Sequence, residues 1–145
     1  MPGKLLIDLT DERFFTAENA EVIAFIRLTN PFAHSDVGDI LFQNAKHLPH
    51  TSAYCPAPSN FAYVVLHTTA TNRIFAIAWD MRGLAVRLAA PSREDALARG
   101  GTIADKIGAD WVAIPPWGTL DGMDGQARAR YWCERAHGEA LAAER

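Results

Sequence analysis

Three short apolar runs separated by turn-forming residues limit what this chain can fold into. The runs are FAYVVLHT (61–68), RIFAIAW (73–79) and LAVRLA (84–89), and the separators are TATN and DMRG. Separators this short join antiparallel neighbours, whereas a parallel pair needs a crossover of a dozen or more residues. The spacing therefore predicts a three-strand antiparallel meander that begins at residue 61.

Strand alternation divides the middle run between two apolar faces. It places Phe75, Ile77 and Trp79 on one face. It places Ile74 and the small residues Ala76 and Ala78 on the other. A strand that is apolar on both faces is typical of a sheet covered on both sides. The small alanines predict that a helix lies close to their face.

Helical periodicity predicts two helices before the meander. The first follows Thr16 as its N-cap and carries an apolar face at four positions: Val22, Phe25, Ile26 and Thr29. The second begins at Ser35 or Asp36, ends before Pro49, and carries a stripe at helical spacing: Val37, Ile40, Leu41, Ala45 and Leu48. The segment 49–58 contains three prolines and predicts an extended loop.

The C-terminal third predicts a short helix, a strand and a long helix. The short helix starts at Ser92 as its N-cap and ends at Gly100, and DWVAIPPW (110–117) is a fourth strand cut short by its prolines. The last helix spans about 126–143 and has a narrow apolar stripe: Ala129, Trp132, Cys133, Ala136, Ala140 and Ala143. The whole pattern predicts a single α+β domain over 1–145, with a curved antiparallel sheet packed against helices.

Composition agrees with a globular, cytoplasmic protein. A chain of 145 residues is long enough for one domain with a sizeable core. No apolar run approaches the roughly 20 residues of a membrane helix, and the first residues lack the apolar core of a signal peptide. Two cysteines are too few for a disulfide scaffold, which favours a reducing compartment.

Arg73, Arg82 and Arg87 are candidate binding residues around the second turn of the meander. The overall charge is -3, yet residues 72–106 hold six basic and four acidic groups, a local excess of two positive charges. Guanidinium groups match phosphate oxygens, so this hairpin could contact an anionic partner or nucleic acid. The alternative is an ordinary solvated turn.

Trp117 is the fourth candidate binding residue. It follows two prolines and precedes GTLDGMDG, whereas the other tryptophans fall on expected core faces. An indole in such a loop either caps the core or lines a groove for a partner.

Cys55 and four histidines raise the alternative of a thiol- or metal-dependent enzyme. The histidines are His34, His47, His50 and His67. Zinc needs three or four ligands in a tetrahedral array, and these spacings match no standard zinc site. A thiol nucleophile needs a nearby base, which only the tertiary fold could supply here. The sequence therefore predicts no catalytic residue, no metal ligand and no cofactor, and the chain carries no phosphate-binding loop or dinucleotide fingerprint.

Residues 61–143 resemble the MmcQ/YjbR-like family of small bacterial proteins and, more distantly, the TfoX N-terminal domain. The resemblance rests on RIFAIAWDMRGLAVRL, SREDALARGG, GADWVAIPPW and ARARYWCERAHGEAL, in that order. It implies an antiparallel sheet packed against helices, and it implies DNA binding, the role often given to members of the family. This chain differs in having two helices and a proline-rich loop before the sheet, and in a less basic hairpin.

These observations predict a non-catalytic binding or regulatory module whose partner is unknown. The expected contacts are Arg73, Arg82 and Arg87, the loop 49–58, and Trp117. Nucleic-acid binding through the hairpin is the first alternative, and an enzyme built around Cys55 is the second. Because a short meander leaves an edge strand exposed, a homodimer is also possible.

Overall fold

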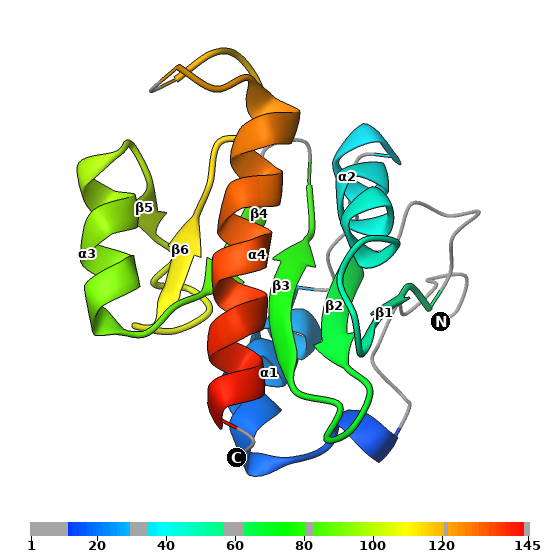
Figure 1. Ribbon diagram of the computed structural model, residues 1–145. Helices are drawn as coiled ribbons and strands as arrows, with labels where there is room; N and C mark the ends of the chain where they lie inside the picture. The colour runs from blue at the N-terminus through cyan, green and yellow to red at the C-terminus, as the bar shows by residue number, and fades with distance from the viewer. Residues whose placement is uncertain (1–11, 30–34, 57–62, 81–82, 121, 144–145) are drawn as a thin grey trace, which may run out of the picture.

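The chain folds into three layers, with helices on both faces of one sheet (Figure 1). The computed structural model describes residues 12–29, 35–56, 63–80, 83–120 and 122–143. These residues contain six strands, four α-helices and two short 3-10 helices. The predicted α+β class with an antiparallel sheet is confirmed. In the described part of the chain, no helix is both long enough and apolar enough to cross a membrane.

The elements follow one another along the chain with short connections. The strands are β1 (Thr51–Tyr54), β2 (Val64–Thr68), β3 (Ile74–Ala78), β4 (Leu84–Arg87), β5 (Thr102–Ile103) and β6 (Trp111–Ala113). The helices are η1 (Glu12–Phe14), η2 (Ala17–Asn19), α1 (Ala20–Thr29), α2 (Ser35–Ala45), α3 (Ala90–Ala98) and α4 (Gly125–Ala143).

The sheet has the strand order β1-β2-β3-β4-β6-β5, and every neighbouring pair is antiparallel. The central β2-β3-β4 meander and the short strand β6 are confirmed. The prediction of a loop throughout 49–58 is wrong, because Thr51–Tyr54 pairs with β2 as an edge strand. The other edge is the two-residue strand β5, which the sequence did not indicate.

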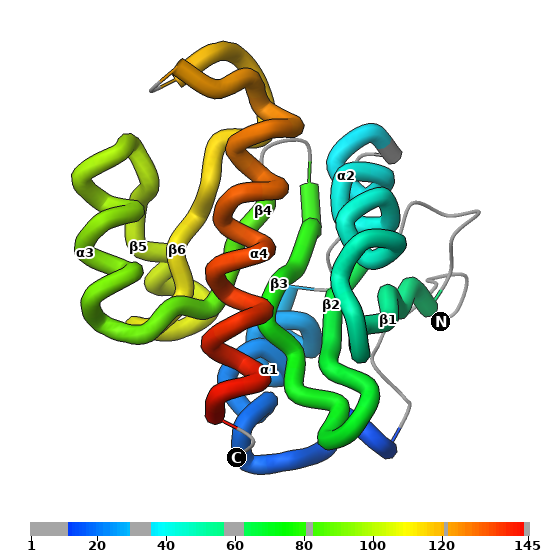
Figure 2. The backbone as a smooth tube through the Cα atoms, in the orientation of Figure 1, coloured from blue at the N-terminus to red at the C-terminus, as the bar shows by residue number. Residues whose placement is uncertain are grey.

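Two apolar clusters hold the layers together, one on each face of the sheet. Helices α2 and α4 cross one face and α1 lies behind the other (Figure 2). Ala76 and Ala78 of β3 share a cluster with Ala136 and Ala140 of α4. The small side chains let helix and sheet approach closely, so the predicted docking of the last helix on the alanine-rich face is confirmed.

A β-bulge overturns the simple alternation predicted for β3. Leu66 pairs with Ala76 but His67 pairs with Ile74, so Phe75 is the extra residue on the β3 side. A bulge of this kind puts two successive side chains on the same face. Phe75 therefore packs with Ala76 under α4, whereas Ile77 packs with the α1 cluster.

Two predicted helix caps are wrong. Thr16 precedes η2 rather than α1 and its side chain makes no capping hydrogen bond. Helix α3 begins at Ala90 with Ala89 at its N-cap position, so Ser92 lies inside the helix. The predicted apolar faces are otherwise buried, except that Ala45 is half-buried and that the last positions of two faces, Thr29 and Ala143, lie at helix ends and are exposed.

Candidate functional site

Arg73 and Arg87 meet in one pocket because of the way β3 and β4 pair. Arg73 immediately precedes β3 and Arg87 ends β4, and antiparallel pairing brings these two positions to the same end of the sheet. The pocket has a volume of about 220 Å³ and is mostly apolar apart from the two arginines and two carboxylates. Its remaining lining residues are Phe75, Leu88, Ala89, Asp110, Ala136, Glu139, Ala140 and Ala143. We call it the arginine pocket.

Arg87 is half-buried and has a carbonyl as its partner instead of a carboxylate. Its Nη1 donates a hydrogen bond of 2.6 Å to the carbonyl oxygen of Glu18. Burial, and then the positive charge of Arg73, lower the pKa of the Arg87 guanidinium, although nearby carboxylates partly oppose this effect. Arginine stays protonated in proteins, so the positive charge is held in an unfavourable environment that a bound anion would improve.

Arg73 presents a donor that has no acceptor. Its Nε is buried and makes no hydrogen bond, although its backbone N–H donates to Thr68 Oγ1 over 3.3 Å. Across the described ranges of the chain, no ion pair joins Arg73 or Arg87 to a carboxylate. A buried donor left without a partner costs about 1–3 kcal/mol, and more when the group is charged.

The two carboxylates of the arginine pocket are engaged elsewhere. Asp110 Oδ1 accepts a hydrogen bond of 2.9 Å from Arg93 Nη1. Glu139 accepts from the backbone N–H of Ala89 over 2.6 Å through Oε1, and from the Ser92 hydroxyl through Oε2. Glu139 thereby supplies the cap that the start of α3 lacks. These contacts explain why neither carboxylate forms an ion pair with Arg73 or Arg87.

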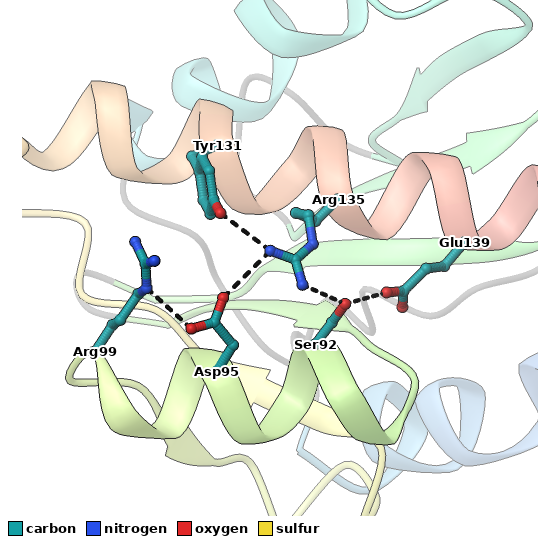
Figure 3. Close-up of polar contacts among 6 residues, drawn as sticks. All are labelled: Ser92, Asp95, Arg99, Tyr131, Arg135 and Glu139. Atoms are coloured by element: carbon teal, nitrogen blue, oxygen red, sulfur yellow. Dashed lines mark hydrogen bonds and ion pairs between the residues drawn. The ribbon is translucent and has the colours of Figure 1, made fainter.

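Glu139 belongs to a polar network that clamps α3 onto α4 (Figure 3). Arg135 of α4 donates to Ser92 Oγ over 2.7 Å and to Asp95 Oδ2 over 3.3 Å. Asp95 in turn pairs with Arg99 over 3.0 Å. Ser92 is only 5% exposed, so its hydroxyl is not placed to attack a substrate. The network serves packing, and it fixes the wall of the arginine pocket that Glu139 provides.

Trp117 lies in a different site from the two arginines. It borders a groove of about 920 Å³ between α2 and the start of α4, and this groove shares no lining residue with the arginine pocket. Trp117 is 41% exposed. The single contact surface predicted from the sequence is therefore divided. Arg82 lies outside the described residues, so its place in either site is not defined.

Arg128 fixes the loop that carries Trp117, a role that was not predicted from the sequence. Its side chain is 2% exposed and donates hydrogen bonds only to backbone carbonyls, those of Pro115, Trp117, Gly118 and Met123. At Gly125 the carbonyl of Pro116 comes so close that no Cβ would fit. The signal for Arg128 was its position four residues before Trp132, on the buried stripe of α4.

The structure does not support a metal site among the residues it describes. No three histidine, cysteine, aspartate or glutamate side chains in these ranges are grouped to hold an ion. His47 and His50 are exposed, His67 is buried, and His34 lies outside the described residues. Cys55 is half-buried and packs against both apolar clusters. A thiol- or metal-dependent enzyme gains no support from this arrangement.

Cys133 provides a pH-dependent test of the core. It is fully buried, and burial raises the pKa of its thiol from 9.0 to about 12. The folded-state pKa is higher than the unfolded-state pKa. The contribution of the protonated Cys133 thiol to the free energy of unfolding is therefore complete below about pH 9 and is lost as pH rises towards 12. Between about pH 7.5 and 10 we expect the free energy of unfolding to fall by about 1.4 kcal/mol more in the wild type than in Cys133→Ala. Urea unfolding at both pH values measures this difference, and equal losses would contradict the prediction.

Comparisons with known proteins give this chain no relative: no family model, no curated protein and no solved structure matches it.

Proposed function

We propose that the protein is a non-catalytic binding module that holds a small anionic group, a carboxylate or a phosphate, between Arg73 and Arg87. The observation that supports this most is the buried Nε of Arg73, which has no hydrogen-bond acceptor in a pocket it shares with a second guanidinium. Guanidinium donors form a fork that matches two oxygens of a carboxylate or phosphate. An anion in this pocket would supply the missing acceptor and offset the repulsion between the arginines.

The dimensions of the arginine pocket favour a small ligand. Small-molecule sites have volumes of roughly 300 to 1,000 Å³, and this pocket has about 220 Å³. Its apolar wall comes from Phe75 and Leu88 on the sheet and from alanines of α4. The ligand that fits best is a small anion, or the anionic end of a molecule with a short apolar portion.

Nucleic-acid binding, the function implied by the resemblance to the MmcQ/YjbR-like family, is the alternative. The binding of duplex DNA relies on many lysine and arginine contacts to successive phosphates. Around Arg87 the structure instead places the carboxylates of Glu18, Glu21 and Asp110. These negative charges would face the neighbouring phosphates of a polyanion, so we favour a single anionic group.

The test is calorimetric titration with inorganic phosphate and, separately, with acetate. We expect at least one anion to bind the wild type, and we expect Arg73→Gln and Arg87→Gln each to weaken binding at least tenfold, since a charge-assisted hydrogen bond contributes about 1.5–3 kcal/mol. Arg130→Gln is the matched control, because Arg130 lies on α4 outside the arginine pocket. Its affinity should equal that of the wild type.

A second readout separates ligand binding from a structural role. If Arg73 serves a ligand, Arg73→Gln should leave the ligand-free protein at least as stable as the wild type, because it removes a like charge and an unpaired donor. Thermal unfolding without anions measures this. Unchanged affinity in both arginine variants would overturn the proposal. Tight duplex-DNA binding that falls steeply with salt and is lost in these variants would replace it with the nucleic-acid alternative.

Compartment and assembly are also proposals. We propose a reducing compartment such as the cytoplasm, supported by Cys55 and Cys133, which are not joined in a disulfide. A homodimer through an exposed sheet edge stays a prediction. The described edges are the half-buried strand β1 and the exposed, two-residue strand β5, and a short edge offers little for strand pairing.

A further inference from the structure

The groove beside Trp117 is larger than the arginine pocket and has the opposite chemistry. It runs between α2 and the first turns of α4, which stand side by side at one end of the molecule (Figure 1). We call it the Trp117 groove. Its volume of about 920 Å³ lies within the range of ligand-binding sites.

The charges in the Trp117 groove are mainly negative. Asp36 and Asp39 line it from α2, and Asp124 lines it from the residue before α4. The cation on the same wall, Arg130, forms an ion pair of 3.4 Å with Glu134. A groove with this excess of carboxylates attracts a cationic occupant and repels an anionic one.

A buried amide adds an acceptor that is independent of these carboxylates. Asn44 lines the groove and is only 7% exposed. Its Nδ2 donates to the carbonyl oxygen of Ile40 over 2.9 Å, which fixes the orientation of the amide. Among the described residues, no donor reaches its Oδ1. The Asn44 Oδ1 is open to the groove rather than sealed in the core, so it can accept a hydrogen bond from an occupant that carries N–H donors.

Trp117 supplies an aromatic surface for the same kind of occupant. Its backbone is held by Arg128, whose Nη2 donates to the Trp117 carbonyl over 2.8 Å. Trp117 is 41% exposed as a whole residue and borders the groove. The face of an indole attracts a guanidinium or ammonium group by about 0.5–2 kcal/mol, depending on how far the pair is desolvated.

We propose that the Trp117 groove docks a basic peptide segment of a partner protein, with an arginine or lysine side chain set against Trp117, Asp39 and Asn44. The groove offers acceptors and an aromatic face, which suit a cation that carries N–H donors. Gln43 and Gln126, which also line it, can both donate to and accept from peptide groups, and this favours a peptide over a simple polyamine. The proposal is independent of the arginine pocket.

The direct test is fluorescence anisotropy with a labelled peptide of alternating arginine and glycine, and with its glutamate counterpart. We expect the arginine peptide to bind and the glutamate peptide not to bind. Trp117→Ala should weaken binding roughly fivefold or more, and Asp39→Asn roughly threefold or more. Both residues are exposed, and circular dichroism checks that the variants fold. Glu94→Gln, which removes an exposed carboxylate on α3, is the control and should bind like the wild type.

A second test needs no knowledge of the partner. Trp111 and Trp132 are buried and Trp79 is half-buried, so Trp117 is the tryptophan that a quencher in solution reaches most easily. The difference between the wild type and Trp117→Phe isolates its contribution. Iodide is intrinsically the stronger quencher of indole, so the ratio of caesium to iodide quenching is compared with that of free N-acetyltryptophanamide. In an acidic groove this ratio should be higher for the Trp117 component than for the free compound. A caesium-to-iodide ratio no higher than that of N-acetyltryptophanamide, absence of peptide binding at millimolar concentration, or equal binding by Trp117→Ala would each overturn the proposal. Spermine binding more tightly than the peptide would exclude the peptide as occupant.

Discussion

Replacing Arg128 with methionine is expected to lower the free energy of unfolding by about 3 kcal/mol or more. Methionine retains much of the apolar stem but cannot donate hydrogen bonds. In the wild type the buried guanidinium donates to the backbone carbonyls of Pro115, Trp117, Gly118 and Met123. These carbonyls would lose a charged donor at once, and the segment between β6 and α4 would lose its main attachment to the helix.

Urea unfolding of Arg128→Met measures the stability, and acrylamide quenching of Trp117 measures the order of its loop. We expect a lower midpoint together with more efficient quenching. Arg130→Met is the matched control, because Arg130 is exposed on the same helix and should change stability by no more than about 0.5 kcal/mol. Equal stability of the Arg128 and Arg130 variants would show that the four carbonyls find other partners.

The part of the fold that follows from local pattern was predicted from the sequence. The meander could be predicted because the turns after β2 and β3 are too short for a crossover connection. Helix α4 could be predicted because its small apolar residues recur at helical spacing. Strand β1 was missed because Thr51–Tyr54 carries no alternating apolar pattern of its own. Its pairing with β2 is a tertiary interaction, and β5 is too short to produce a pattern.

The wrong predictions for the face of Phe75 and for the N-cap of α3 also come from tertiary interactions that local sequence patterns do not show. Phe75 changes face because a bulge adds one residue to β3, and no glycine or other local signal marks the position. Ser92 satisfies the rule for an N-cap, but Glu139, 47 residues further along the chain, accepts from both Ala89 and Ser92 instead. A helix on the other side of the contact thus supplies the cap, which local rules cannot anticipate.

Of the two candidate sites, the arginine pocket could be predicted in part from the sequence and the Trp117 groove could not. The proximity of Arg73 and Arg87 follows from the meander. The start of β3 lies beside the end of β4 in an antiparallel pair, and the two arginines are at these positions. That Trp117 lies in a separate groove depends on where α2 packs against α4, and no periodicity encodes this. Asn44 was not singled out, because a single asparagine at a buried helical position resembles any other polar residue until its neighbours are known.

The close packing of α4 on the sheet depends on small side chains in both layers. Ala136→Leu is expected to destabilise the protein by about 3 kcal/mol, because Ala136 is 1% exposed and packs in the same cluster as Ala76 and Ala78. Ala142→Leu places the same side chain on the exposed side of α4 and should change stability by less than about 0.5 kcal/mol. Chemical denaturation of both variants measures the contrast. Leucine tolerated at both positions would mean that the helix can move away from the sheet without loss, and close packing of small residues would then not be what fixes α4.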